Sequence, residues 1–186
     1  MRAAAAAAIE VARMVQIVFA VVIFTTVLWA AFGYDRLVAL RNRCRNAWSQ
    51  VDIQLERRHG LISKLAGVVQ RYAAHERDTL QRLAEARTKA VRAVTVFERG
   101  NAECALSGAL SGVYAVVEAY PDLMAHRSFL RLQEELRDTE ERIRFARQFY
   151  NDTVLRYNTR LAVFPDIIIA RLFRLQQGGY FDLGSS

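Results

Sequence analysis

The feature that most constrains this chain is an uncharged apolar run near its N-terminus. From Met14 to Phe32 there are 19 residues without a charged side chain, and Gln16, Thr25 and Thr26 are the polar ones among them. A helix of this length extends about 28 Å at 1.5 Å per residue, close to the thickness of the hydrocarbon core of a bilayer. The run therefore predicts a transmembrane helix.

A cleaved signal peptide is the alternative interpretation of the same run. It would need an apolar core of about 7–15 residues followed by small residues at the cleavage site. This core is longer, and the candidate site at Ala30 and Ala31 lies between Trp29 and Phe32. Trp29 and Tyr34 instead fit the aromatic belt at a membrane surface. We therefore expect an uncleaved signal anchor.

Basic residues near the ends of the run predict its orientation. Two lie before it, Arg2 and Arg13, and four follow it closely: Arg36, Arg41, Arg43 and Arg45. The side of a membrane with more Lys and Arg is usually the cytoplasm. We expect the N-terminus outside and the larger C-terminal part in the cytoplasm. The same four arginines are candidates for contact with anionic lipid.

The charge of the chain is concentrated next to this run. The net charge is +7, and residues 33–99 carry 14 basic and 7 acidic side chains, whereas residues 100–186 carry 10 and 11. A basic protein can bind nucleic acid or an anionic membrane surface. The position of the charge favours the membrane, and we expect no nucleic-acid partner. A membrane-tethered nucleic-acid binder remains the alternative, and salt-dependent DNA or RNA binding by residues 34–186 would favour it.

The remaining sequence has helical periodicity and no run that alternates with period two. Residues 34–98 contain no Pro, and their apolar positions recur every three or four residues. They predict one very long helix, or two helices joined by a kink at His59–Gly60. Gly100 and Asn101 then resemble a stop signal.

Two further helical segments follow that stop signal. Residues 103–120 predict a short helix with a face of small residues, in which Gly108 and Gly112 form a GxxxG pattern suited to close packing against a neighbouring helix. After Pro121 a heptad seam extends to Pro165 through Phe129, Leu132, Leu136, Thr139, Ile143, Ala146, Tyr150, Val154, Tyr157, Leu161 and Phe164. A last short helix is expected over 166–175.

These observations predict an all-α protein with an N-terminal transmembrane helix and an elongated antiparallel bundle of long helices. The expected parts are a short N-terminal tail (1–13), a transmembrane anchor (14–33), a helical-bundle domain (34–176) and a C-terminal tail (177–186).

Several longer motifs resemble the LemA family of bacterial membrane proteins. They are "LVALRNRCRNAWSQVDIQLERRHGLI" (37–62), "EAYPDL" (118–123), "LQEELRDTEERIRFARQFYND" (132–152), "YN" at 157–158, "FPDIIIARLF" and "YFD". Residues 61–65 depart from the family, which usually has Leu-Ile-Pro-Asn-Leu there. The resemblance implies a helical cytoplasmic domain on an N-terminal anchor in the bacterial inner membrane, and no known enzymatic reaction. Some relatives are tied to magnetosome organelles, which suggests membrane organisation.

The motifs for metal and catalytic chemistry are incomplete. His75-Glu76 begins like a HExxH zinc motif, but Thr79 stands where the second histidine is needed. The three histidines, His59 among them, are interpreted as exposed helix-surface residues, and Cys44 as a small core residue. No metal, cofactor or catalytic residue is therefore expected.

An acidic run on the last long helix leaves one enzymatic alternative. It consists of Glu134, Glu135, Asp138, Glu140 and Glu141, and it lacks the Glu-x-x-His spacing of di-iron sites. We interpret it as a solvated helix face. A membrane enzyme that uses the region of Glu135 and Glu140 remains the alternative, and metal analysis would distinguish the two.

One polar cluster could fix the register of the bundle. Tyr150-Asn151 and Tyr157-Asn158 repeat at a spacing of seven residues beside the heptad seam, and Asn42, Ser49 and Asp52 could face them from the first long helix. The sequence as a whole predicts a non-enzymatic, membrane-anchored scaffold or adaptor that binds unidentified protein partners and can form oligomers.

Overall fold

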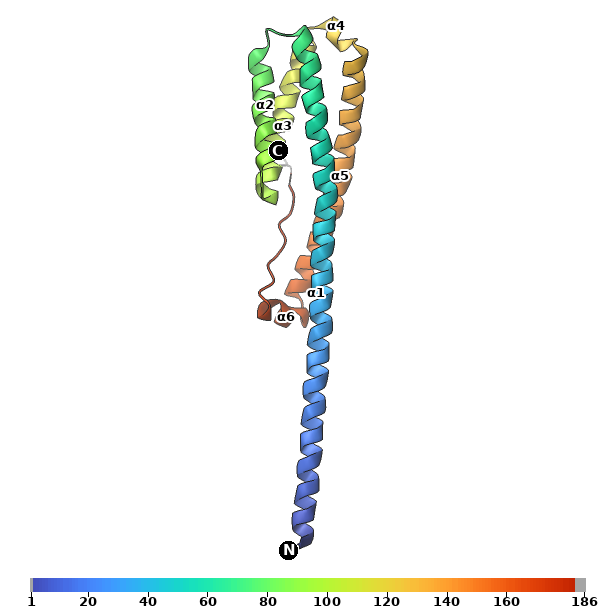
Figure 1. Cartoon of the computed structure of the whole chain (residues 1–186), viewed down its shortest axis with the longest axis vertical. Coiled ribbons are helices and arrows are strands. Elements are labelled where there is room, and N and C mark those ends of the chain that lie inside the picture. Colours follow the sequence, from blue (N-terminus) through green and yellow to red (C-terminus); the bar gives the residue numbers. More distant parts are fainter. Residues whose placement is uncertain (1, 183–186) are drawn as a thin grey trace. The chain divides into compact units, whose positions relative to one another are not determined.

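The computed structural model describes residues 2–182, and every helix or strand assigned in that range is a helix. In chain order the helices are α1 (Arg2–Tyr72), α2 (Arg77–Arg92), α3 (Val96–Val117), α4 (Pro121–Met124), α5 (Arg127–Ala162) and α6 (Asp166–Leu172), as Figure 1 shows. The predicted all-α class is confirmed. Within the described range the chain forms two compact units, residues 2–42 with 157–177, and residues 43–156 with 178–182.

The part of α1 over residues 16–29 is apolar and has no protein packed around it. Phe19, Phe24 and Val27 are 67%, 64% and 61% exposed. The apolar window of α1 has a mean hydropathy of 2.2, and none of it is buried by the rest of the chain. Among the described helices, α1 is the one long and apolar enough to cross a membrane by length and composition.

The two polar hydroxyls in this apolar stretch are satisfied within the helix itself. Thr25 donates a hydrogen bond to the carbonyl oxygen of Val21 at 2.9 Å, and Thr26 donates to that of Val22 at 2.7 Å. Such bonds to the preceding turn let a hydroxyl be accommodated where no water is available. Both residues therefore agree with the predicted anchor.

The second half of α1 continues without a break past the glycine at which a kink was considered. Gly60 is exposed and a side chain there would have no neighbour within 4 Å. The flanking residues Leu61 and Ile62 are 4% and 0% exposed. Their burial holds this turn in the helix, because the apolar surface removed from water outweighs the cost of one helical glycine, about 1 kcal/mol. The chain leaves the helix after Tyr72 instead.

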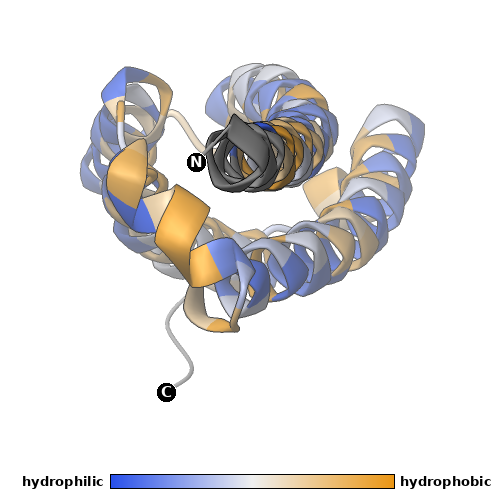
Figure 2. Cartoon of the chain, turned by 90° about the horizontal axis from the view of Figure 1, so that it is seen from below, coloured by the Kyte–Doolittle hydropathy of each residue, from blue (hydrophilic) through white to orange (hydrophobic). Residues whose placement is uncertain are grey.

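In the larger unit, four helical segments run alternately up and down: the end of α1, then α2, α3 and the first part of α5 (Figure 1). The helices carry hydrophobic and hydrophilic residues on different sides of their ribbons (Figure 2). Their apolar sides form one core, which includes Leu65, Val69, Leu83, Leu106, Leu110, Val113, Phe129 and Leu136. Each of these side chains is no more than 3% exposed.

The third helix begins earlier than the sequence analysis predicts. Thr95 is its N-cap and forms a capping box with Glu98, with hydrogen bonds of 3.2 Å and 3.1 Å between backbone and side chain. These bonds also lower the pKa of the Glu98 carboxyl. Gly100 and Asn101 lie inside α3, so their interpretation as a stop signal is wrong. Gly100 is required for another reason, because a Cβ there would overlap the backbone carbonyl oxygen of Asp182.

The heptad seam of α5 is confirmed over most of its length. Leu136, Ile143 and Val154 are 1%, 3% and 0% exposed. Phe164, the last predicted member, is 75% exposed. The reason is that α5 ends at Ala162, so Phe164 no longer follows the helical spacing.

The C-terminal segment 178–182 packs on the larger unit, although the sequence suggested a tail. Phe181 is fully buried, and its ring centroid lies 5.2 Å from that of Trp48. The Asn151 side chain both donates to the backbone oxygen of Phe181 at 3.0 Å and accepts from its N–H at 2.9 Å. Tyr150 donates its hydroxyl to the carbonyl of Gly179 at 2.8 Å.

The smaller unit joins α6 to α1. Ile169 of α6 is 2% exposed and lies against Gly33, where a Cβ would overlap its side chain. The rings of Tyr34 and Phe173 meet with their centroids 4.5 Å apart.

The buried seam of α5 gives a direct test of the bundle. We predict that Ile143→Asp lowers the thermal unfolding temperature of the full-length protein in detergent, because an unpaired buried carboxylate costs several kcal/mol. The matched control is Glu141→Ala, since Glu141 is exposed two residues away on the same helix. Circular dichroism measures both. Equal unfolding temperatures for the two variants would contradict the seam.

Candidate functional site

The larger unit contains a buried cluster of charged side chains. Arg58 and His59 of α1 and Glu103 of α3 are 4%, 6% and 0% exposed. Charged residues are seldom buried this completely unless they are paired. Three elements contribute to the cluster, because Glu140 of α5 also reaches Arg58.

Glu103 is the centre of this cluster. One carboxylate oxygen accepts from Nη1 of Arg58 at 2.9 Å, and the other lies 2.5 Å from Nε2 of His59. Nη2 of Arg58 continues to the hydroxyl of Ser107 at 2.8 Å and to Oε1 of Glu140 at 3.3 Å. Helices α1, α3 and α5 are therefore held together by one network of charge-assisted hydrogen bonds.

A pocket of about 410 Å³ opens beside the cluster. Arg58, Ser107 and Glu140 form part of its wall, and the remaining lining includes Tyr114, Arg144 and Arg147. Burial, together with the negative charge of Glu140, raises the pKa of the Tyr114 hydroxyl, although Arg58 acts in the opposite direction. Tyr114 therefore remains a neutral hydrogen-bond donor at physiological pH.

The bonds of the cluster connect helices of the bundle to one another. Both carboxylate oxygens of Glu103 contact side chains of α1. The backbone oxygen of His59 accepts a hydrogen bond from Nε of Arg87 at 3.0 Å. Among the described residues, no group of three or more His, Cys, Asp or Glu side chains is arranged to hold a metal ion. This arrangement acts as a polar clamp that fixes how α1, α2, α3 and α5 fit together.

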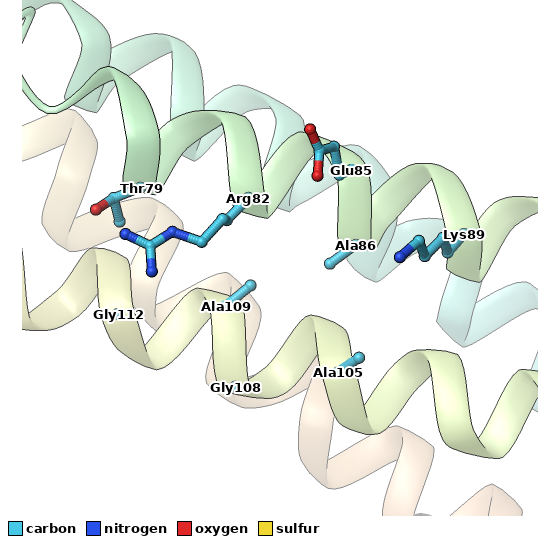
Figure 3. A pocket seen from close by; sticks show the side chains of 9 residues that line it. All are labelled: Thr79, Arg82, Glu85, Ala86, Lys89, Ala105, Gly108, Ala109 and Gly112. Atoms are coloured by element: carbon cyan, nitrogen blue, oxygen red, sulfur yellow. The ribbon is translucent and has the colours of Figure 1, made fainter.

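A second hollow lies between α2 and α3 (Figure 3). It has a volume of about 470 Å³, and α3 contributes its small residues, among them Gly108 and Gly112. The expected close packing of this GxxxG pattern is wrong. A side chain at Gly108 would have no neighbour within 4 Å, and one at Gly112 would only touch Thr79 at 3.9 Å. Arg82 and Lys89 of α2 line the hollow opposite these small residues (Figure 3).

The four candidate lipid-facing arginines are all on the surface of α1. Arg36, Arg41, Arg43 and Arg45 are exposed, and none of them forms an ion pair with a carboxylate of residues 2–182. Cys44 between them is buried as expected, and burial raises the pKa of its thiol.

The residues predicted to form an interhelical polar seam make different contacts. Tyr150 and Asn151 bond to the backbone of residues 179 and 181, and Tyr157 donates its hydroxyl to the carbonyl of Gln176 at 3.1 Å. Asn158 is half-buried, whereas Asn42 and Ser49 are exposed. Asp52 pairs with Arg99 at the surface. These hydrogen bonds of the tyrosines and Asn151 thus lead to residues 176–181.

The clamp itself was missed by the sequence analysis. His59 was interpreted as an exposed residue, and this is wrong because its ring packs beside Glu103. Arg58 and Glu103 are separated by 45 residues, so helical periodicity could not pair them. The signal that could have been used is position: Glu103 precedes Leu106 and Leu110 at helical spacing, on the side of α3 that the core requires to be apolar.

The fold and its clamp define a class: helical proteins with a candidate membrane-spanning N-terminal helix. The model of the LemA family matches residues 47–186, and the chain belongs to this family. It is also similar to the magnetosome proteins MamQ 1 and MamQ 2 of Paramagnetospirillum magneticum strain AMB-1. Each is 23% identical over 196 residues, which cover 91% of this chain and 71% of the relative.

The clamp predicts a large difference between two paired glutamates. Glu103→Ala leaves Arg58 and His59 buried without their main partner, and should cost about 3–5 kcal/mol of the free energy of unfolding. Glu134→Ala is the matched control. Glu134 pairs with Arg137 at 3.0 Å, but its side chain is 65% exposed, so its loss should cost about 0–1 kcal/mol. Thermal unfolding of the full-length protein measures both, and equal losses would contradict the clamp.

Proposed function

We propose that this protein is a single-pass membrane protein whose helical domain serves as a non-enzymatic scaffold or adaptor at a bacterial membrane. The observation that carries the proposal is the uncovered apolar stretch of α1, which precedes the bundle in the same helix. The similarity to magnetosome proteins supports a role in membrane or organelle organisation.

The outer surface of α5 supports a protein partner. Phe145 and Phe149 are 62% and 61% exposed and lie one turn apart on the same face of the helix. Exposed aromatic side chains grouped in this way are typical of protein–protein contacts, because aromatic residues contribute most to the binding energy of interfaces. A scaffold would use this face to hold its partner.

This role can be tested by photocrosslinking in living cells. We predict that a photoreactive amino acid in place of Phe149 gives discrete protein adducts, and that these remain in membranes washed with carbonate. The control position is Arg137, whose side chain is 73% exposed on the same helix. Absence of adducts at position 149 would contradict the scaffold role. Release of the protein by carbonate would contradict the anchor.

We further propose that the N-terminus lies outside and the helical domain lies in the cytoplasm. The support is the excess of arginines after the span. The native cysteines are poor reporters, since Cys44 is buried and its raised thiol pKa slows alkylation. We therefore use Ser49→Cys, which introduces an exposed thiol, in a chain with Cys44→Ala and Cys104→Ala.

The predicted result is that an impermeant thiol reagent leaves Ser49→Cys unlabelled in cells with a permeable outer envelope. Labelling should appear once the inner membrane is opened with detergent. Modification before that step would place the domain outside the cytoplasm and would remove the basis for lipid contact by the four arginines on that face.

A further inference from the structure

The surface around α6 is unusually apolar for a helix of seven residues. Its exposed side chains include Val163, Phe164, Ile168, Leu172 and Phe173, which are 48%, 75%, 52%, 73% and 50% exposed. Single exposed apolar residues are normal, but a contiguous group of large ones marks a surface that contacts something other than water.

The position of α6 in the smaller unit suggests what covers this surface. Ile169 lies against Gly33 of α1, and Phe173 packs on Tyr34. These contacts fall directly after Phe32, the last residue of the uncharged run. Figure 1 shows α6 beside α1. The helix is thus fixed at the point where the proposed transmembrane segment leaves the bilayer.

Basic side chains border the apolar surface. Arg171 and Arg174 line a hollow of about 560 Å³ together with Gln176 and Gln177. Both arginines are exposed, and neither forms an ion pair with a carboxylate within residues 2–182. Guanidinium groups bind phosphate oxygens with two parallel hydrogen bonds, so this hollow suits the phosphate of an anionic phospholipid.

We propose that α6 and its flanking residues 163–174 form a second membrane contact, which lies in the boundary between headgroups and acyl chains. Phe164, Ile168 and Leu172 enter the apolar layer, and Arg171 and Arg174 hold headgroup phosphates. The inference rests on the proposed membrane anchor. Short elements with an apolar side and flanking arginines bind bilayer surfaces in this way, through buried apolar area and attraction to anionic lipid.

The test places an environment-sensitive fluorophore at single cysteines of the full chain with Cys44→Ala and Cys104→Ala. The protein is reconstituted in vesicles of phosphatidylethanolamine and phosphatidylglycerol, with or without lipids that carry a quencher near the headgroup. The reporter is Leu172→Cys. The control is Leu130→Cys, an exposed leucine in the first turns of α5, and Val22→Cys reports on the anchor with a quencher deep in the acyl chains.

The expected result is loss of most of the fluorescence at position 172 with the shallow quencher, a shift of its emission to shorter wavelength, and neither change at position 130. Quenching at position 22 without quenching at position 172 would overturn the α6 contact and leave the anchor intact. Absence of quenching at position 22 would overturn the anchor and the α6 contact together. A label at position 172 shielded from lipid and aqueous quenchers would show a protein partner or a second copy there, and would overturn the proposal.

The anionic part of the proposal has its own measurement. Replacing phosphatidylglycerol by phosphatidylcholine, or introducing Arg171→Gln with Arg174→Gln, should reduce quenching at position 172 and leave position 22 unchanged. If quenching at position 172 is the same in all three samples, the two arginines do not bind headgroups and that role is overturned.

Discussion

Burying the Glu103 carboxylate is the constraint that the larger unit has to satisfy. Taking an ion out of water costs several kcal/mol, and its attraction to a counter-ion offsets this only when the geometry is good. Arg58 and His59 meet this condition at 2.9 Å and 2.5 Å. Both come from adjacent residues of α1, so a shift of α1 by one residue would move the two donors away from the carboxylate. The clamp therefore selects one register of α1 against α3.

Other close contacts depend on that register. Once α3 is fixed, the lack of a side chain at Gly100 leaves room for the backbone carbonyl of Asp182. The C-terminal segment can then lie on the bundle, where Asn151 bonds to both backbone groups of Phe181. An asparagine that satisfies a donor and an acceptor of one residue acts as a substitute for a strand partner, and this allows a segment without secondary structure to be buried. The segment and the clamp both contact the N-terminal part of α3, at Gly100 and at Glu103.

Features that depend on the pattern of a single helix could be predicted from the sequence. The heptad seam of α5 and the apolar run of α1 are both patterns within one helix, and the structure contains both helices. Contacts between residues far apart in the sequence, such as Arg58 and Glu103, could not be predicted in this way. The misread start of α3 is a different case, because Thr95 and Glu98 form a recognisable capping box. Gly100 was given more weight than this box, although a glycine can serve close packing as well as helix termination.

Three consecutive isoleucines of α6, Ile167 to Ile169, show why contacts with the rest of the protein do not cover all the apolar surface of this helix. Successive residues of a helix point about 100° apart, so the three cannot share one face. Ile169 is 2% exposed against α1, whereas Ile168 is 52% exposed on another side. A helix that is apolar on several sides is stable in water only when most of them are covered. The rest of the protein covers one side of α6, at Gly33. The apolar layer of a bilayer beside α1 would cover another side. The proposed transmembrane segment requires the same environment.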